Sequence, residues 1–340
     1  MNRFLRPLRV LLCGGVQRRP GEALFSAQSR ACERALVLVR LFYTANLFLA
    51  GWRLVERAPL NAFGAFDPLW PLFWADGRDV QSVVLGVFTA NAIVAAIAAI
   101  VPADGVVRWL AFFGALAAGA LENSFGSIGH AGHAWVWIMF FLALLPSGGP
   151  DRIMASRVVR QRYLQIFWTS QFAVLMFYSM SGCLKLASVP AQWSRGEVCA
   201  VGPEALARHI ANRVLQTQSE PLLAEWLIDN ISISWVLFLG TLYLESASVL
   251  VAFRPALHRV WGSAISLLHL GIGLSMEIWF VPPILALSIL LVGSPFHSEG
   301  TTWRQMFWQL PGMELVQSLL RPRHAIRRVR WIGQIALGRA

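Results

Sequence analysis

Long apolar stretches recur through the whole chain and constrain its fold more than any other feature. A helix needs about 20 apolar residues to cross the hydrocarbon core of a membrane. Eight stretches approach or exceed that length, at residues 35–52, 80–101, 106–123, 131–146, 162–185, 231–253, 259–278 and 279–296. Because a backbone in lipid must satisfy its own polar groups, the sequence predicts an all-α, polytopic membrane bundle of about eight transmembrane helices.

Composition supports this class of protein. Hydrophobic residues make up 56% of the 340 residues and charged residues 14%, whereas soluble domains average about 45–50% and about 25%. The apolar runs are too long and too unalternating for an outer-membrane barrel. Since the stretches at 106–123, 131–146 and 279–296 are short, a count of six or seven helices also remains open.

The basic residues are distributed unevenly between the two ends of the predicted helices. The chain has 29 basic and 18 acidic residues, and every basic residue except Lys185 is arginine. With eight spans both termini share one side, which holds most of the arginines. Only six fall on the other side: Arg53, Arg57, Arg78, Arg195, Arg208 and Arg213. The positive-inside rule then predicts cytoplasmic termini, in a bacterial cytoplasmic membrane.

Three regions follow from this pattern. Residues 1–30 form a basic cytoplasmic segment without the features of a signal peptide, and residues 31–296 form the transmembrane domain. Residues 297–340 form a basic amphipathic tail suited to a lipid surface, so the bilayer itself is the expected partner. Arginines at helix ends make no basic stripe, and no nucleic-acid partner is expected.

One long connection on the predicted outer side stands out, from Ser188 to Asn230. Apolar residues recur there at helical spacing, and they predict two short amphipathic helices that lie on the outer membrane surface. A connection of this length serves either as a lid or binding element or as a plain connector between helices. The sequence leaves both readings open.

Ionisable residues inside apolar stretches cost roughly 2.5–3.5 kcal/mol each, so they usually face the bundle interior and have partners. Lys185 lies near the outer end of the stretch 162–185. It either snorkels to the headgroups or acts as a general base. The second reading rests on chemistry, because arginine keeps its proton in proteins and a desolvated lysine can lose it.

Three further ionisable residues lie within predicted spans. Glu245 has no charge nearby in sequence, so it must pair across helices, be protonated or face water. His133 and His269 are interior residues or members of a site. His130 and His133 are three residues apart, but they lack further ligands at fitting spacing, and no metal is predicted. Lys185, His133, Glu122, Asn123 and the part of the seventh stretch that holds His269 fall in the same half of the bilayer, and they predict a polar pocket that opens outward under the 188–230 segment.

A resemblance to a known family rests on a run in the fifth stretch. The run is Gln171…Tyr178-Ser-Met-Ser-Gly182-Cys-Leu-Lys185-Leu…Trp193-Ser-Arg-Gly196. It resembles the signature of the HTTM superfamily, the membrane domain shared with vitamin K-dependent γ-carboxylases. His133-Ala-Trp-Val-Trp, Leu242-Tyr-Leu-Glu245 and His269 follow the family's order, and the likeness covers residues 30–296.

The resemblance implies a carboxylase-like enzyme that uses a reduced, vitamin K-like quinone, oxygen and CO2. Lys185 would deprotonate the quinone, and His133 and His269 would position it or stabilise developing oxyanions. Glu245 would be a structural or proton-relay partner. Tyr178, Trp193, Asn123 and His130 would complete the cofactor site.

The chain departs from the carboxylase pattern at three places. Leu184 replaces one lysine of a pair, and Gly132 replaces an asparagine. The tail after residue 296 has no room for the large domain that holds the carboxylases' protein substrate. The substrate is therefore left open between a small molecule, a lipid and a peptide, and so is the oligomeric state.

Two other classes of function compete with the enzyme. One is a non-catalytic membrane protein that assists the maturation, immunity or export of a partner. The other is a transporter, which ranks last because no internal repeat is visible. Cys183 and Cys199 both fall near the outer side, but two cysteines alone do not predict a disulfide.

Overall fold

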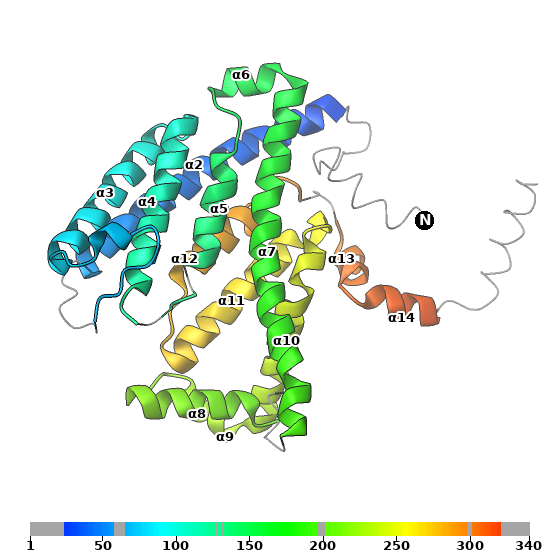
Figure 1. Ribbon diagram of the computed structural model, residues 1–340. Helices are drawn as coiled ribbons and strands as arrows, with labels where there is room; N and C mark the ends of the chain where they lie inside the picture. The colour runs from blue at the N-terminus through cyan, green and yellow to red at the C-terminus, as the bar shows by residue number, and fades with distance from the viewer. Residues whose placement is uncertain are drawn as a thin grey trace, which may run out of the picture. The chain divides into compact units, whose positions relative to one another are not determined.

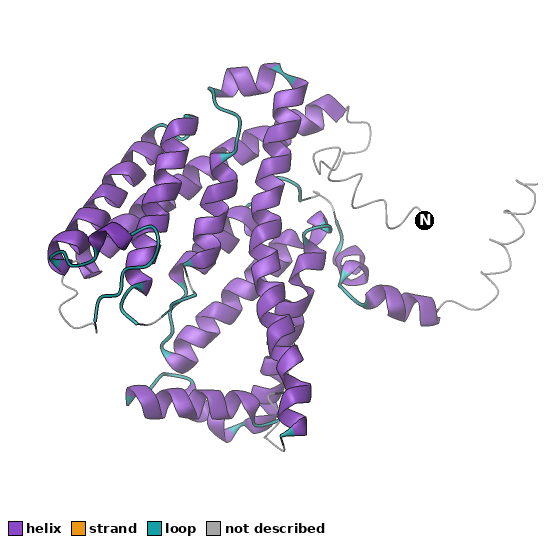
Figure 2. Ribbon diagram, viewed as in Figure 1, coloured by secondary structure: helices purple, strands orange, loops and turns teal. Residues whose placement is uncertain are grey.

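The computed structural model describes residues 24–57, 65–126, 128–130, 132–195, 201–297 and 301–320. Every regular element among these residues is a helix (Figures 1 and 2). The chain divides into two compact units, Met1–Ser298 and Glu299–Ala340, and each is described by itself. The predicted all-α architecture is therefore confirmed for the described residues.

The helices of the first unit follow the predicted apolar stretches. They are α2 (Leu24–Arg57), η1 (Phe73–Ala75), α3 (Val80–Ile100), α4 (Gly105–Asn123), α5 (His133–Ala143), α6 (Pro150–Ala155), α7 (Arg157–Ser194), α8 (Ala205–Thr217), α9 (Ala224–Asp229), α10 (Ile231–Val251), η2 (Pro255–Leu257), α11 (His258–Met276), α12 (Val281–Leu287) and η3 (Ser288–Val292). The second unit holds α13 (Trp303–Gln309) and α14 (Met313–Leu320).

Five described helices are long and apolar enough to cross a membrane. They are Ser26–Glu56 of α2, α3, α4, Arg157–Gln192 of α7, and α10. Only 28–44% of the residues in their most apolar windows are buried inside the protein. Most of these residues are therefore not covered by the described part of the chain, and a bilayer is one medium that covers such apolar helices. Five helices of this kind are consistent with a multi-pass membrane protein.

The predicted count of about eight spans is not confirmed. The 11 residues of α5 are about 17 Å long at 1.5 Å per residue, well short of a hydrocarbon core of about 30 Å. The apolar segment Val281–Val292 is equally short. α11 begins with His258 and Arg259 and contains His269, and it is not among the five long apolar helices.

Local sequence signals explain where several helices begin and end. The carboxylate of Asp79 accepts the backbone N–H of Ser82 at 2.9 Å and caps α3, and Asp104 caps α4 in the same way. Glu277 has a φ of 54° and ends α11 in the left-handed conformation. Prolines follow in the first turn of α12, where the missing N–H is tolerated.

Small residues bring neighbouring helices close together. Ala111, Ala115 and Ala118 form a buried stripe on α4, which packs against α3. This is the small-residue packing that membrane helices use in place of a hydrophobic driving force. The long helix α7 packs against α2, α5 and α10, and it thereby connects helices that precede it in the chain with a helix that follows it (Figure 1).

The segment from Ser188 to Asn230 contains the two short helices that the sequence predicted. α7 extends to Ser194, so the connection itself starts later than expected. Figure 1 shows α8 and α9 lying across the ends of α10 and α11. The backbone N–H of Leu223 donates to the carbonyl of Leu274 at 2.9 Å and fixes this segment to α11.

Candidate functional site

One face of α7 carries the residues on which the site is built. Tyr178, Gly182 and Lys185 recur at i, i+4 and i+7, so they lie on the same side of the helix. Gly182 is buried, and a Cβ added there would lie 2.5 Å from the backbone nitrogen of Ser246. The absence of a side chain at Gly182 is therefore what lets α7 and α10 approach closely at this point.

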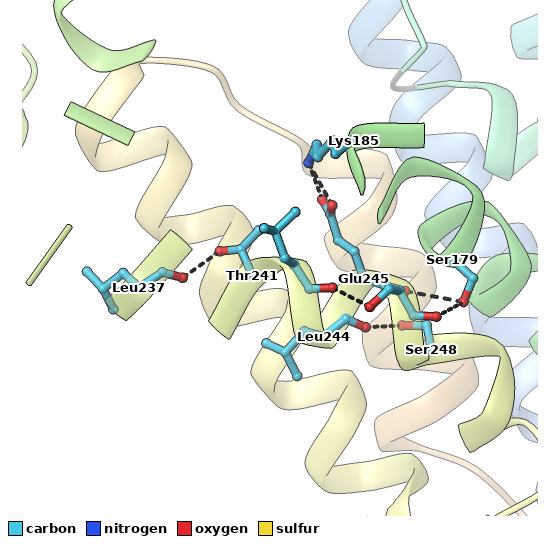
Figure 3. A network of polar contacts seen from close by, with 9 residues as sticks. Ser179, Lys185, Leu237, Thr241, Leu244, Glu245 and Ser248 are labelled. Carbon is cyan, nitrogen blue, oxygen red and sulfur yellow. Dashed lines mark hydrogen bonds and ion pairs between the residues drawn. The ribbon is translucent and has the colours of Figure 1, made fainter. Parts of the chain in front are cut away.

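Directly beside this close approach, Lys185 of α7 pairs with Glu245 of α10 (Figure 3). The Lys185 Nζ donates to both carboxylate oxygens, to Oε1 at 2.8 Å and to Oε2 at 2.6 Å. The two residues are 60 positions apart in the chain, so the pair exists only because the helices pack. Of the alternatives open for Glu245, the structure selects pairing across helices.

The two partners differ in their surroundings. The Glu245 side chain is 10% exposed, whereas that of Lys185 is 42% exposed. Leu184 and Leu186 beside the lysine are exposed as well. The carboxylate is thus held inside the protein, whereas the lysine side chain is partly exposed at the protein surface.

Tyr178 joins this face to α11. Its hydroxyl is 2.6 Å from Nε2 of His269, and the His269 ring packs on Phe280 with the ring centroids 4.8 Å apart. His269 is 8% exposed, and its Nδ1 is buried without a hydrogen-bond partner among the described residues. A buried nitrogen of this kind is costly unless a ligand or water binds it.

Hydrogen bonds of serine side chains connect α7 to α10 and α10 to α11 near the ion pair. The Ser179 hydroxyl lies 3.0 Å from the carbonyl oxygen of Ser246, to which it donates. Figure 3 shows Ser179 reaching from α7 toward the backbone of α10 beside Glu245 and Ser248. The indole N–H of Trp261 on α11 donates to the Ser248 hydroxyl at 2.9 Å. Three helices are thereby held in register around Glu245.

The other predicted site residues have different neighbours. Asn123 Oδ1 accepts the backbone N–H of Gly129 at 2.6 Å, and the rings of His130 and His133 have centroids 5.2 Å apart. Among the described residues, no hydrogen bond or ion pair joins these three side chains to Lys185 or Glu245. The contacts therefore join Lys185 to Glu245 and Tyr178 to His269. They do not join Asn123, His130 or His133 to the Lys185–Glu245 pair.

A second ion pair lies at the ends of α2 and α4. Arg53 Nε is 3.0 Å from Glu122 Oε1, and both side chains are largely buried. Trp193 lies in the last turn of α7, and its side chain is outside the described part of the structure. Cys199 also lies outside it. No group of three potential metal ligands occurs among the described residues.

Two residues that support the pair were not singled out in the sequence. They are Gly182 and Ser179, which lie within the Tyr178–Lys185 run. Both are small residues on an apolar helix, and small residues are enriched where membrane helices approach closely. That signal was present, but the partner helix was not identifiable from it.

In the described residues, fold and site together define an all-helical bundle with five long apolar helices and a lysine–glutamate pair between two of them. Comparison with protein-family models, with curated proteins and with solved structures finds no match for this chain. The site must therefore be interpreted from its own chemistry and from the sequence resemblance.

Proposed function

We propose that the chain is an HTTM-superfamily membrane enzyme with carboxylase-like chemistry, in which Lys185 is the general base toward a reduced, vitamin K-like quinone. The observation that carries the proposal is the position of Lys185. The only lysine of the chain is held by both oxygens of a buried carboxylate, on the helix face that also carries Tyr178 and, through it, His269.

The residues present fit a quinone-like ligand. His269 Nδ1 is buried and lacks a partner, so it can exchange a hydrogen bond with a ligand oxygen. Lys185 Nζ has three hydrogen-bonding positions and uses two on Glu245, which leaves one for a ligand. Lys185 and His269 would therefore hold the oxygens of the quinone, and the exposed leucines beside Lys185 would border its apolar part.

Glu245 gives Lys185 the means to act as a base. When the ammonium passes one proton to the carboxylate, the N–H bond breaks, an O–H bond forms on Glu245, and Nζ regains its lone pair. Both partners are then neutral, and the free amine can accept the proton of a ligand hydroxyl.

Bound here, a reduced quinone would supply, together with oxygen, the strong base that removes a proton from the substrate before CO2 adds. Tyr178 would orient the His269 ring through the contact of its hydroxyl with Nε2, which leaves Nδ1 for a ligand. We further propose that the site faces the outer side of a bacterial cytoplasmic membrane and that both termini are cytoplasmic. The arginine distribution supports this orientation.

The test uses the full-length chain in lipid nanodiscs. Mass spectrometry of the purified protein should detect a bound quinone, and the protein should consume reduced vitamin K in the presence of oxygen. Lys185→Arg keeps the positive charge opposite Glu245 but cannot give up its proton, so we expect a loss of about 10²–10⁴-fold in quinol consumption at unchanged thermal stability. Leu110→Ala on α4, where the side chain is 51% exposed and has no assigned role, is the control and should retain activity.

Two results would count against the enzyme. Full activity in Lys185→Arg would remove the general-base role of Lys185. The absence of both bound quinone and quinol consumption in the unmodified chain would favour the non-catalytic class, a membrane protein that assists a partner. In that case Lys185→Met should leave the partner's maturation, immunity or export intact.

A further inference from the structure

The chain reverses direction directly after α11, and the reversal brings two aromatic side chains back to that helix. The backbone N–H of Glu277 donates to Gly273 O at 2.9 Å, and the left-handed conformation of Glu277 ends the helix. Trp279 and Phe280 follow before α12 begins at Val281. Both rings contact residues of the helix that the chain has just left, so the turn folds back along the end of α11.

The indole of Trp279 lies against the backbone of Gly273. A Cβ added at Gly273 would be 2.6 Å from both Cε3 and Cζ3 of Trp279 and 3.1 Å from Cδ2. These three atoms belong to the six-membered ring of the indole. Gly273 is buried, whereas Trp279 is 55% exposed. The absence of a side chain at Gly273 is therefore what lets the indole pack this closely on α11.

Phe280, the residue after Trp279, packs on the ring of His269. The two ring centroids are 4.8 Å apart, and the planes are inclined at 44°. The Tyr178 hydroxyl lies 2.6 Å from Nε2 of the same imidazole. The His269 ring is thus held by a polar contact at one nitrogen and by an aromatic contact. Because one peptide bond joins Trp279 to Phe280, a displacement of the indole also displaces the ring that packs on His269.

The α8–α9 segment is bonded to the same end of α11. The backbone N–H of Leu223 donates to Leu274 O at 2.9 Å, and Arg213 Nε donates to Met276 O at 3.4 Å. Met276 also packs against a buried cluster of Ile210, Ala224 and Leu227. Carbonyls in the last turn of a helix lack intrahelical partners, so these bonds fix the helix end. A change at Gly273 must therefore be absorbed by the aromatic turn.

We propose that Trp279 is a positioning residue for His269. Its indole, seated on Gly273, holds Phe280 against the imidazole and thereby sets the direction of His269 Nδ1 toward a ligand. The identity of that ligand rests on the proposed function, whereas the arrangement of the three aromatic rings does not. Trp279 acts through Phe280.

Gly273→Ala tests this arrangement with a single methyl group. Ordinary carbon contacts are about 3.5–4.0 Å, so the indole would have to move by about 1 Å. A displacement of about 1 Å at a group that aligns a reactant can cost about 10²-fold in rate. Gly271→Ala is the matched control on the same helix, because a Cβ there meets nothing within 4 Å. Trp279→Ala removes the indole instead of displacing it, and it serves as a second variant.

The main measurement is nuclear magnetic resonance of the full-length chain, labelled in its histidines and held in lipid nanodiscs. The ring signals of His269 are identified by their loss in His269→Gln. They report on the Phe280 ring, because a nearby aromatic ring shifts the resonances of the atoms above it. We expect Gly273→Ala and Trp279→Ala to shift the His269 signals. Gly271→Ala should leave them unchanged, and Trp279→Phe, which keeps an aromatic ring, should shift them less than Trp279→Ala.

Quinol consumption by the same variants tests the link to the ligand. Gly273→Ala and Trp279→Ala should lower kcat by about 10²-fold with KM little changed, because the misaligned imidazole affects the reaction more than the apolar part of binding. Gly271→Ala should retain the activity of the unmodified chain.

The outcomes separate the two proposals. His269 signals that stay unchanged in both Gly273→Ala and Trp279→Ala would overturn the positioning role. Equal shifts in Gly271→Ala and Gly273→Ala would overturn it as well, since they would indicate a general loosening of α11. Shifted signals with full quinol consumption would contradict the link between Trp279 and the ligand. If the unmodified chain neither binds nor consumes quinol, the proposed function fails, and the resonance comparison still decides whether Trp279 positions His269.

Discussion

Gly182 offers the sharpest test of how α7 and α10 position the Lys185–Glu245 pair. Gly182→Ala adds one methyl group, and its carbon would lie 2.5 Å from Ser246 N and 2.9 Å from both Ser246 Cα and Glu245 Cβ. Ordinary contacts of this kind are about 3.5–4.0 Å. The helices would have to separate by about 1 Å at this point, because backbone atoms cannot turn aside as a side chain can.

The size of the effect follows from this geometry. Overpacking of a close contact by one methyl group costs about 1–3 kcal/mol of unfolding free energy. Gly240→Ala on α10 is the matched control, because a Cβ there meets nothing within 4 Å. In an exposed helix position alanine is favoured over glycine by about 0.5–1 kcal/mol. The two variants should therefore differ by about 1.5–4 kcal/mol, with opposite signs relative to the unmodified protein.

Unfolding free energies are measured by titration of detergent micelles with sodium dodecyl sulfate, followed by circular dichroism. Gly182→Ala should also lower quinol consumption, because separation of the helices lengthens the bonds between Lys185 Nζ and the Glu245 carboxylate. If Gly182→Ala is as stable as Gly240→Ala, the two helices do not meet through Gly182 and Ser246, and the packing argument fails.

Two further predictions use the same unfolding assay. Trp135→Phe removes the hydrogen bond from the indole N–H to Asn46 Oδ1 at 2.9 Å and should lower the unfolding free energy by about 1 kcal/mol. Trp137→Phe, at a position 49% exposed, should lower it by less than half as much. Equal effects of the two variants would contradict the importance of the buried hydrogen bond. Arg108 is 1% exposed and donates to the carbonyl of Leu145. Arg108→Met should lower the unfolding free energy by about 2–3 kcal/mol, because it removes charge-assisted hydrogen bonds to buried carbonyls. A decrease below about 0.5 kcal/mol would refute this role.

The buried arginine also refines the charge analysis. The sequence places Arg108 among the arginines that set orientation. In the structure its guanidinium donates to Pro102 O, just after α3, at 2.9 Å, and also to Leu145 O, just after α5. Carbonyls at helix C-termini lack intrahelical partners and carry partial negative charge. Arg108 therefore stabilises two helix ends, a function that the arginine distribution alone did not indicate.

The sequence by itself determined the helical elements, because membrane helices depend on local properties. The runs of apolar residues place the ends of α3, α4, α10 and α11 within about two residues, whereas α2 and α7 extend well beyond their predicted stretches. The number of spans was not determined in this way. Whether an 11-residue helix such as α5 crosses a membrane depends on how its neighbours support it, not on its own composition.

The candidate site was only half determined by the sequence. Lys185 stood out because it is the only lysine of the chain. Glu245 and His269 stood out because an ionisable side chain within an apolar stretch is energetically costly. Their partners were decided by tertiary packing, because the Lys185–Glu245 pair spans 60 positions and the Tyr178–His269 pair spans 91. Spacing along one helix shows which residues share a face. Only the close approach of α7 to α10 at Gly182, and the position of α11 beside them, decides what that face meets.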